Sequence, residues 1–80
     1  MDSTSYEIEI KRHALLQALK RGVTPDMIDS TIKGGTVQRS AKHTVKFTMA
    51  YKKCSVVCVG HIIGKRIVIF TVETTRGHYG

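Results

Sequence analysis

The residues of this chain that could do chemistry are four histidines set among many basic side chains. The sequence holds thirteen Lys and Arg residues, three tyrosines and the histidines His13, His43, His61 and His78. Such groups suffice to cleave RNA, because the 2′-OH of the substrate is the nucleophile and the protein supplies an acid, a base and cations. The inventory therefore permits RNA cleavage without metal, leaving a 2′,3′-cyclic phosphate, but does not require it.

Other familiar catalytic patterns do not occur in the sequence. It has no Walker-type glycine loop, no Gly-x-Ser-x-Gly elbow and no Cys–His pair at a recognisable metal spacing. Five of the six acidic residues lie within residues 1–29, so the sequence offers no carboxylate pair for glycosidase or two-metal chemistry. We expect neither a metal nor a cofactor.

His13 is the first candidate for a general acid or base, since imidazole exchanges protons near neutral pH. Arg39 and Lys46 would then stabilise the charge that builds on phosphorus in the transition state. The alternative for His13 is a structural role at the start of a helix. Each of the other histidines is a weaker candidate.

The distribution of charge indicates a polyanionic partner. The net charge is +7, and residues 30–80 hold nine bases against the single acid Glu73. This asymmetry favours nucleic acid, here RNA, over a membrane surface, because no basic amphipathic helix carries the charge. The alternatives are a generically basic surface, non-catalytic nucleic-acid binding, and a module that docks an acidic protein. The predicted RNA-binding residues are Arg39, Lys42, Lys46, Lys52, Lys53, Lys65, Arg66 and Arg76.

Two helices are predicted in the first half of the chain. Residues 6–10 alternate like a short strand, and residues 11–21 then carry Leu15, Leu16 and Leu19 on one helical stripe with two alanines beside it. Gly22 suits the position after a helix. The second helix is predicted to begin at Thr24-Pro25-Asp26, a strong capping sequence, and to end at Gly34-Gly35.

The second half reads as strands. Residues 36–39, 43–49, 54–62 and 66–73 show strand patterns, with His43 expected half-buried on an apolar face. Lys42 and Lys46 would share a polar face with Cα atoms roughly 13 Å apart. The apolar run from Cys54 suggests a central strand covered on both sides. Its cysteines, Cys54 and Cys58, would likewise be roughly 13 Å apart, too far for a disulfide.

The order of these elements predicts a single α+β domain over residues 1–80. A short N-terminal strand and a two-helix hairpin would pack on a three- to four-stranded antiparallel sheet. No segment approaches the roughly 18 apolar residues of a membrane span, and residues 1–5 lack the parts of a signal peptide. We expect a cytoplasmic protein.

Several short motifs resemble a bacterial and archaeal family known as domain of unknown function 4258. They are His13-Ala14, the turn Arg21-Gly22-Val23-Thr24-Pro25, Gly34-Gly35, and a final strand from Gly64 to Val72. The resemblance covers residues 6–75 and implies a fold similar to the RelE-like and colicin-like (barnase-like) ribonuclease toxins.

The resemblance also implies a function. A RelE-like toxin of a toxin–antitoxin pair would cleave RNA, ribosome-bound mRNA in the mRNA interferase type, and would bind an acidic antitoxin protein. Family members often carry Arg four residues after the histidine, where this chain has Gln17. That departure favours a relative that binds RNA without cleaving it.

Overall fold

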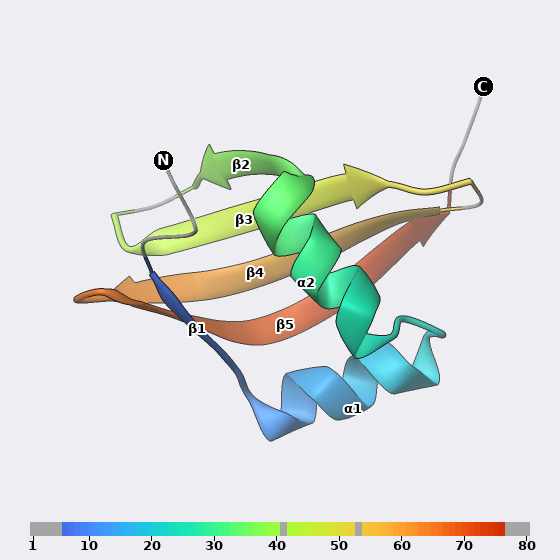
Figure 1. The fold of residues 1–80 in the computed structure, drawn as a ribbon, viewed down its shortest axis with the longest axis horizontal. Coiled ribbons are helices and arrows are strands. Elements are labelled where there is room, and N and C mark those ends of the chain that lie inside the picture. Colours follow the sequence, from blue (N-terminus) through green and yellow to red (C-terminus); the bar gives the residue numbers. More distant parts are fainter. Residues whose placement is uncertain (1–5, 41, 53, 77–80) are drawn as a thin grey trace.

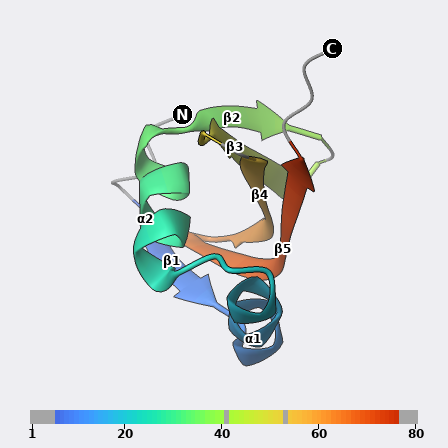
Figure 2. The ribbon, with the colours of Figure 1, turned by 90° about the vertical axis from the view of Figure 1, so that its right-hand side faces the viewer.

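Two helices pack on a five-stranded sheet in the computed structural model, which describes residues 6–40, 42–52 and 54–76. Helix α2 lies across β3 and β4, and α1 runs along β5 (Figures 1 and 2). The elements in chain order are β1 (Glu7–Ile10), α1 (Arg12–Lys20), α2 (Pro25–Gly34), β2 (Thr36–Arg39), β3 (Thr44–Ala50), β4 (Cys54–Ile63) and β5 (Arg66–Arg76). The predicted α+β class is confirmed.

The sheet is mixed rather than purely antiparallel. Its strand order is β1-β5-β4-β3-β2, and the last four strands in sequence form an antiparallel meander. The N-terminal strand β1 pairs parallel with β5, with Glu7 opposite Arg66 and Ile10 opposite Ile69. The prediction of three or four antiparallel strands was therefore incomplete. The helical hairpin carries the chain from one edge of the sheet to the other, so the last strand returns beside the first.

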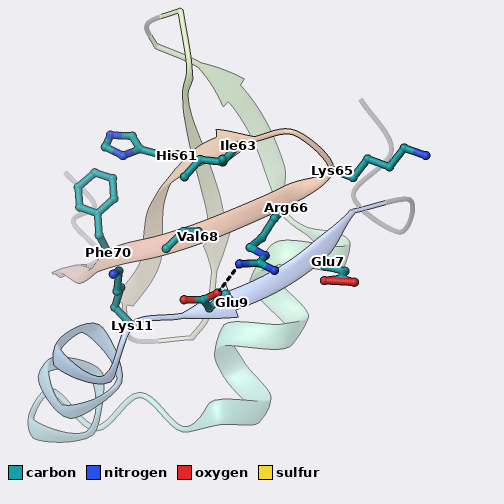
Figure 3. Close-up of a pocket in the computed structure, with 9 residues that line it drawn as sticks. All are labelled: Glu7, Glu9, Lys11, His61, Ile63, Lys65, Arg66, Val68 and Phe70. Carbon is teal, nitrogen blue, oxygen red and sulfur yellow. Dashed lines mark hydrogen bonds and ion pairs between the residues drawn. The ribbon is translucent and has the colours of Figure 1, made fainter.

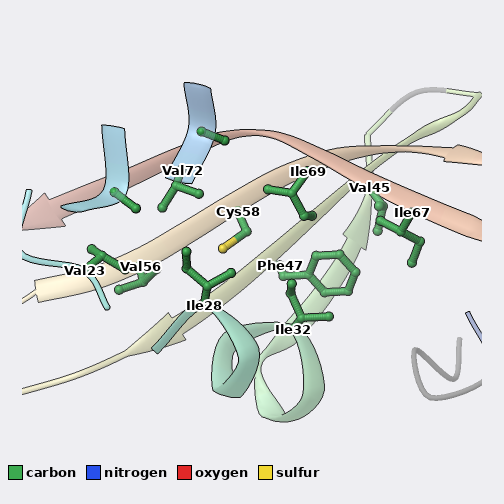
Figure 4. Close-up of a cluster of buried hydrophobic side chains, with 12 residues drawn as sticks. Val23, Ile28, Ile32, Val45, Phe47, Val56, Cys58, Ile67, Ile69 and Val72 are labelled. Atoms are coloured by element: carbon green, nitrogen blue, oxygen red, sulfur yellow. The ribbon is translucent and has the colours of Figure 1, made fainter. Parts of the chain in front are cut away.

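The core lies between the helices and one face of the sheet (Figure 4). Helix α1 contributes two fully buried alanines, Ala14 and Ala18, whereas Leu16 and Leu19 are each 50% exposed. Of the predicted leucine stripe, Leu15 packs against the core, whereas the prediction was wrong for Leu16 and Leu19, because the helix approaches β5 through its small residues. The other fully buried core residues are Val23, Ile28, Ile32, Val45, Phe47, Val56, Cys58, Ile67, Ile69 and Val72.

The helix boundaries follow the predicted capping signals. The Thr24 hydroxyl accepts a hydrogen bond from the Met27 N–H at 3.2 Å, and Pro25 opens α2. Gly22 follows α1 with φ of +79°, a conformation that favours glycine. Both cysteines are free, as predicted. Within the described residues, no helix is long and apolar enough to cross a membrane.

Candidate nucleic-acid interface

One face of the sheet is left uncovered by the helices. Because Val45, Phe47 and Cys58 point into the core, their neighbours along β3 and β4 point the other way, and residues opposite each other on paired strands share a face. The same rule places the alternate residues of β1 and β5 beside them. We call this surface the open face; its residues are Glu7, Glu9, Thr44, Lys46, Thr48, Val57, Val59, His61, Ile63, Arg66, Val68, Phe70, Thr71 and Glu73.

Two rings lie in contact on the open face. The centroids of His61 and Phe70 are 4.5 Å apart, with a tilt of 42° between their planes. The pairing of β4 and β5 shifts between Val59 and Gly60, so that Phe70 is an extra residue in the ladder. Such a bulge re-aims a side chain. His61 is exposed and Phe70 is half-buried, so the pair presents ring surface to solvent.

A cavity of about 640 Å³ opens beside this ring pair, over β1, β5 and the end of β4 (Figure 3). Val68, only 9% exposed, forms its floor. Arg66 donates a hydrogen bond from Nη1 to Oε1 of Glu9 at 3.3 Å across the cavity. The full lining is Glu7, Glu9, Lys11, His61, Ile63, Lys65, Arg66, Val68 and Phe70.

A second hollow continues from the first toward β3. It shares His61 and Ile63 with the cavity and is also lined by Lys42, His43 and Thr44. The loop before β3, the turn between β4 and β5, and the start of β1 meet at this end of the sheet (Figure 1). This end of the sheet therefore holds cationic side chains and the imidazoles of His43 and His61 around the apolar residue Ile63.

The predicted RNA-binding residues are divided between the two ends of the sheet. Lys42, Lys65 and Arg66 lie at the end described above, and Lys46 is half-buried on the open face. Lys52 is exposed in the loop at the opposite end, where Arg76 is the last residue of β5. Lys53 lies outside the described residues.

Arg39 does not share a face with Lys46. It stands opposite Val45, which points into the core, whereas Lys46 stands opposite Val59 on the open face. Its Nη2 donates to the Lys42 carbonyl at 3.3 Å. The predicted RNA-binding residues Arg39 and Lys46 therefore do not line one surface, because they point to opposite faces of the sheet.

The proposed catalytic group of His13, Arg39 and Lys46 is not brought together. His13 is exposed on α1 and borders a hollow that is also lined by Leu16, Gln17, Leu19, Lys20 and Arg21. Helix α1 packs on β5, which β4 separates from β3, and Arg39 lies on the edge strand β2 beyond it. His43 is exposed rather than half-buried, since it precedes the first residue of β3.

His61 and Phe70 are the residues that sequence reasoning undervalued. The prediction that β4 is covered on both sides was wrong, because Val57, Val59 and His61 lie on the uncovered face. The available signal was the alternation of side chains along a strand, which places His61 on the face opposite to Cys58. The local sequence pattern of β5 did not predict the bulge at Phe70.

Comparison of the chain with family models, with curated proteins and with solved structures finds no match. The resemblance to domain of unknown function 4258 and to RelE-like toxins stays a prediction. So do the antitoxin partner and the ribosome-bound mRNA.

Proposed function

We propose that this protein binds single-stranded RNA on the open face. The observation that carries the proposal is the His61–Phe70 ring pair, 4.5 Å between centroids, exposed on a sheet with cations beside it. Unpaired bases stack on aromatic and imidazole rings, and such stacking tolerates any base.

The cations are spaced to follow a backbone across the sheet. Lys46 lies on β3, Lys42 precedes that strand, and Lys65 lies in the turn before β5. Neighbouring strands are about 4.8 Å apart, so these residues span a width of two to three strands. That width suits separate phosphates of one strand of RNA better than a single phosphate.

Single-stranded RNA fits this surface better than duplex. The rings lie on a sheet, where a splayed base can reach them, whereas bases in a duplex are already stacked on each other. Sequence-tolerant binders of single strands combine a cationic track with such rings. The open face supplies both elements.

The test is a titration of labelled oligouridine of about ten nucleotides into the protein and two matched variants. His61→Ala and His43→Ala each remove one exposed imidazole, but only His61 contacts Phe70. We expect His61→Ala to weaken binding about five- to tenfold, in line with the loss of one stacking partner. Equal effects of the two variants, or no binding by the wild type, would refute the proposal; binding of an acidic protein alone would favour the docking module.

Cleavage of the bound RNA is a second candidate, favoured by one pair of residues. Lys46 stands opposite Val59, so His61 is its diagonal neighbour, roughly 7–8 Å away with the Cβ atoms somewhat closer. Such a separation allows an imidazole and an ammonium group to contact one phosphate. The chemistry that the sequence assigned to His13 therefore finds a better-placed base in His61.

The step would be an in-line displacement at phosphorus. His61 takes the proton of the 2′-OH, the 2′-oxygen bonds to phosphorus, and the bond to the 5′-oxygen breaks. The leaving oxygen gains a proton from solvent or a second acid, and Lys46 stabilises the charge on the phosphoryl oxygens. The products are a 2′,3′-cyclic phosphate and a 5′-hydroxyl.

We expect cleavage in EDTA, with and without ribosomes, to be abolished by His61→Ala at saturating RNA and retained by His13→Ala. Analysis of the fragment ends checks for the cyclic phosphate. Loss of cleavage in EDTA would contradict the metal-independent step. RNA that is bound but left intact would leave binding as the function.

A further inference from the structure

We propose that the cavity over β1 and β5 selects guanine, with the Glu9 carboxylate as the group that reads it. The inference rests on the proposed RNA binding and names the base at one position of the site. Its volume of about 640 Å³ lies within the range of about 300–1,000 Å³ that is common for small-molecule sites.

The cavity is laid out as one row across three strands. Glu9 and His61 both stand opposite Val68, one from each side. Two strand spacings therefore separate Glu9 from His61, about 10 Å between their Cα atoms. A base seated over Val68 would meet the His61–Phe70 rings on one side and the Glu9 carboxylate at its opposite edge (Figure 3).

Arg66 positions the Glu9 carboxylate for this role. The bond from its Nη1 to Oε1 of Glu9 is 3.3 Å long, and both side chains are about half exposed. A carboxylate has about four lone-pair sites, so the bond leaves acceptor capacity toward the cavity. A carboxylate can only accept hydrogen bonds, so Glu9 would pair with donor groups of a ligand.

Guanine is the base whose edge matches these two groups. Its N1–H and N2 amino group are adjacent donors, which one carboxylate accepts as a pair, and the neighbouring O6 can accept from the Arg66 guanidinium. Adenine would turn its N1 acceptor toward the carboxylate. Uracil and cytosine each offer one donor with acceptors beside it.

The carboxylates also explain why this part of the site takes a base rather than a phosphate. Glu7 and Glu9 line the cavity together with Lys11, Lys65 and Arg66, and the two carboxylates would repel phosphate oxygens that came close to them. Lys42 and Lys46 lie outside the cavity, where phosphates flanking the base would pass. The open face therefore separates backbone binding from base reading.

The experiment compares oligouridine strands that differ only in one central nucleotide: guanosine, inosine, adenosine, cytidine or uridine. We expect guanosine to be preferred over adenosine by about tenfold or more, the discrimination typical of a paired contact. Inosine keeps N1–H but lacks the N2 amino group, so its affinity should lie between the two.

The matched variants are Glu9→Gln and Glu73→Gln. Both remove one negative charge from the open face, but Glu73 stands opposite Val57, outside the cavity. Glu9→Gln should lose the guanosine preference while binding plain oligouridine at least as well as the wild type, and Glu73→Gln should keep the preference. Equal affinity for all strands, or a preference that survives Glu9→Gln, overturns the inference but leaves RNA binding intact; no binding of any strand overturns both.

Discussion

At the scale of single residues, the two adjacent glycines that end α2 differ in the space around them. A Cβ on Gly35 would lie 2.5 Å from the backbone oxygens of both Thr31 and Thr48. A Cβ on Gly34 would meet only the Met49 methyl group, at 4.0 Å. We therefore expect Gly35→Ala to lower the free energy of unfolding by about 2–3 kcal/mol and Gly34→Ala to change it by less than about 0.5 kcal/mol. Urea titration of both variants checks this. If the two variants were equally stable, the backbone at Thr31 and Thr48 would have to move away from residue 35 at little cost.

Cys58 gives the second prediction at this scale. Burial raises the pKa of its thiol from the ordinary 9.0 to about 11, because the core disfavours a thiolate. The unfolded chain releases this proton above pH 9. The buried thiol therefore makes its full contribution to the free energy of unfolding below pH 9, and this contribution is lost as the pH rises toward 11.

The measurement is the free energy of unfolding of the wild type and of Cys58→Ala at about pH 8 and about pH 10.5. The variant lacks the thiol, so its stability deficit should shrink by about 1–2 kcal/mol at the higher pH. A deficit that does not change with pH would show that the thiol titrates alike in the folded and unfolded chain.

Some residue roles could be predicted from the sequence and others could not. The Thr24 cap and the free cysteines follow from local chemistry and strand spacing, and both were predicted. The ring pair of His61 and Phe70 was not, because it depends on a bulge and on which face of β4 the helices leave open. Those facts are properties of the packed sheet.

At the scale of elements, the fully buried side chains of α1 are its smallest, and Leu15 packs beside them. Ala14 and Ala18 are one turn apart and fully buried, while Leu16 and Leu19 are half exposed. Ala18→Leu should therefore overpack the contact with β5 and cost about 1–3 kcal/mol. Leu19→Ala should cost no more than about 0.5 kcal/mol. Thermal unfolding of the two variants compares these losses of stability. A larger loss in Leu19→Ala than in Ala18→Leu would show that Leu19 belongs to the core.

The element boundaries were predicted well, and the buried side of α1 was not. Capping residues and glycines mark where helices begin and end, so the predicted limits of α2 agree with the structure. Size is a poor guide to the buried face of a short helix, because two alanines at i and i+4 permit a close approach that leucines at neighbouring positions do not. Hydrophobic periodicity alone favoured the larger side chains.

At the scale of the whole molecule, the N-terminal strand completes the candidate site. Glu7 and Glu9 enter the cavity only because β1 pairs with β5. The hydrogen bond between Arg66 and Glu9 joins residues that are 57 positions apart along the chain. No local pattern specifies that pairing. The fold class could be predicted from the order of the elements. The pairing of β1 with β5 that forms the cavity could not, because it depends on the strand order of the folded sheet.

The last prediction concerns the salt dependence of the proposed RNA binding by the whole molecule. Each phosphate neutralised on a single strand contributes about −0.7 to the slope of log K against log salt. Removing three contacting cations should therefore make the slope shallower by about 2. The triple variant is Lys42→Ala, Lys46→Ala and Lys65→Ala, all around the open face.

The matched triple is Arg12→Ala, Lys20→Ala and Arg21→Ala, which removes the same charge from exposed positions on and just after α1. None of these three residues lines the cavity or the second hollow, so this variant should keep the wild-type slope. Long-range attraction by the net charge of +7 would instead act on both variants alike. Equal slopes for the two triples would show diffuse attraction to the whole surface, and a slope lost only in the α1 variant would move the binding site to that helix.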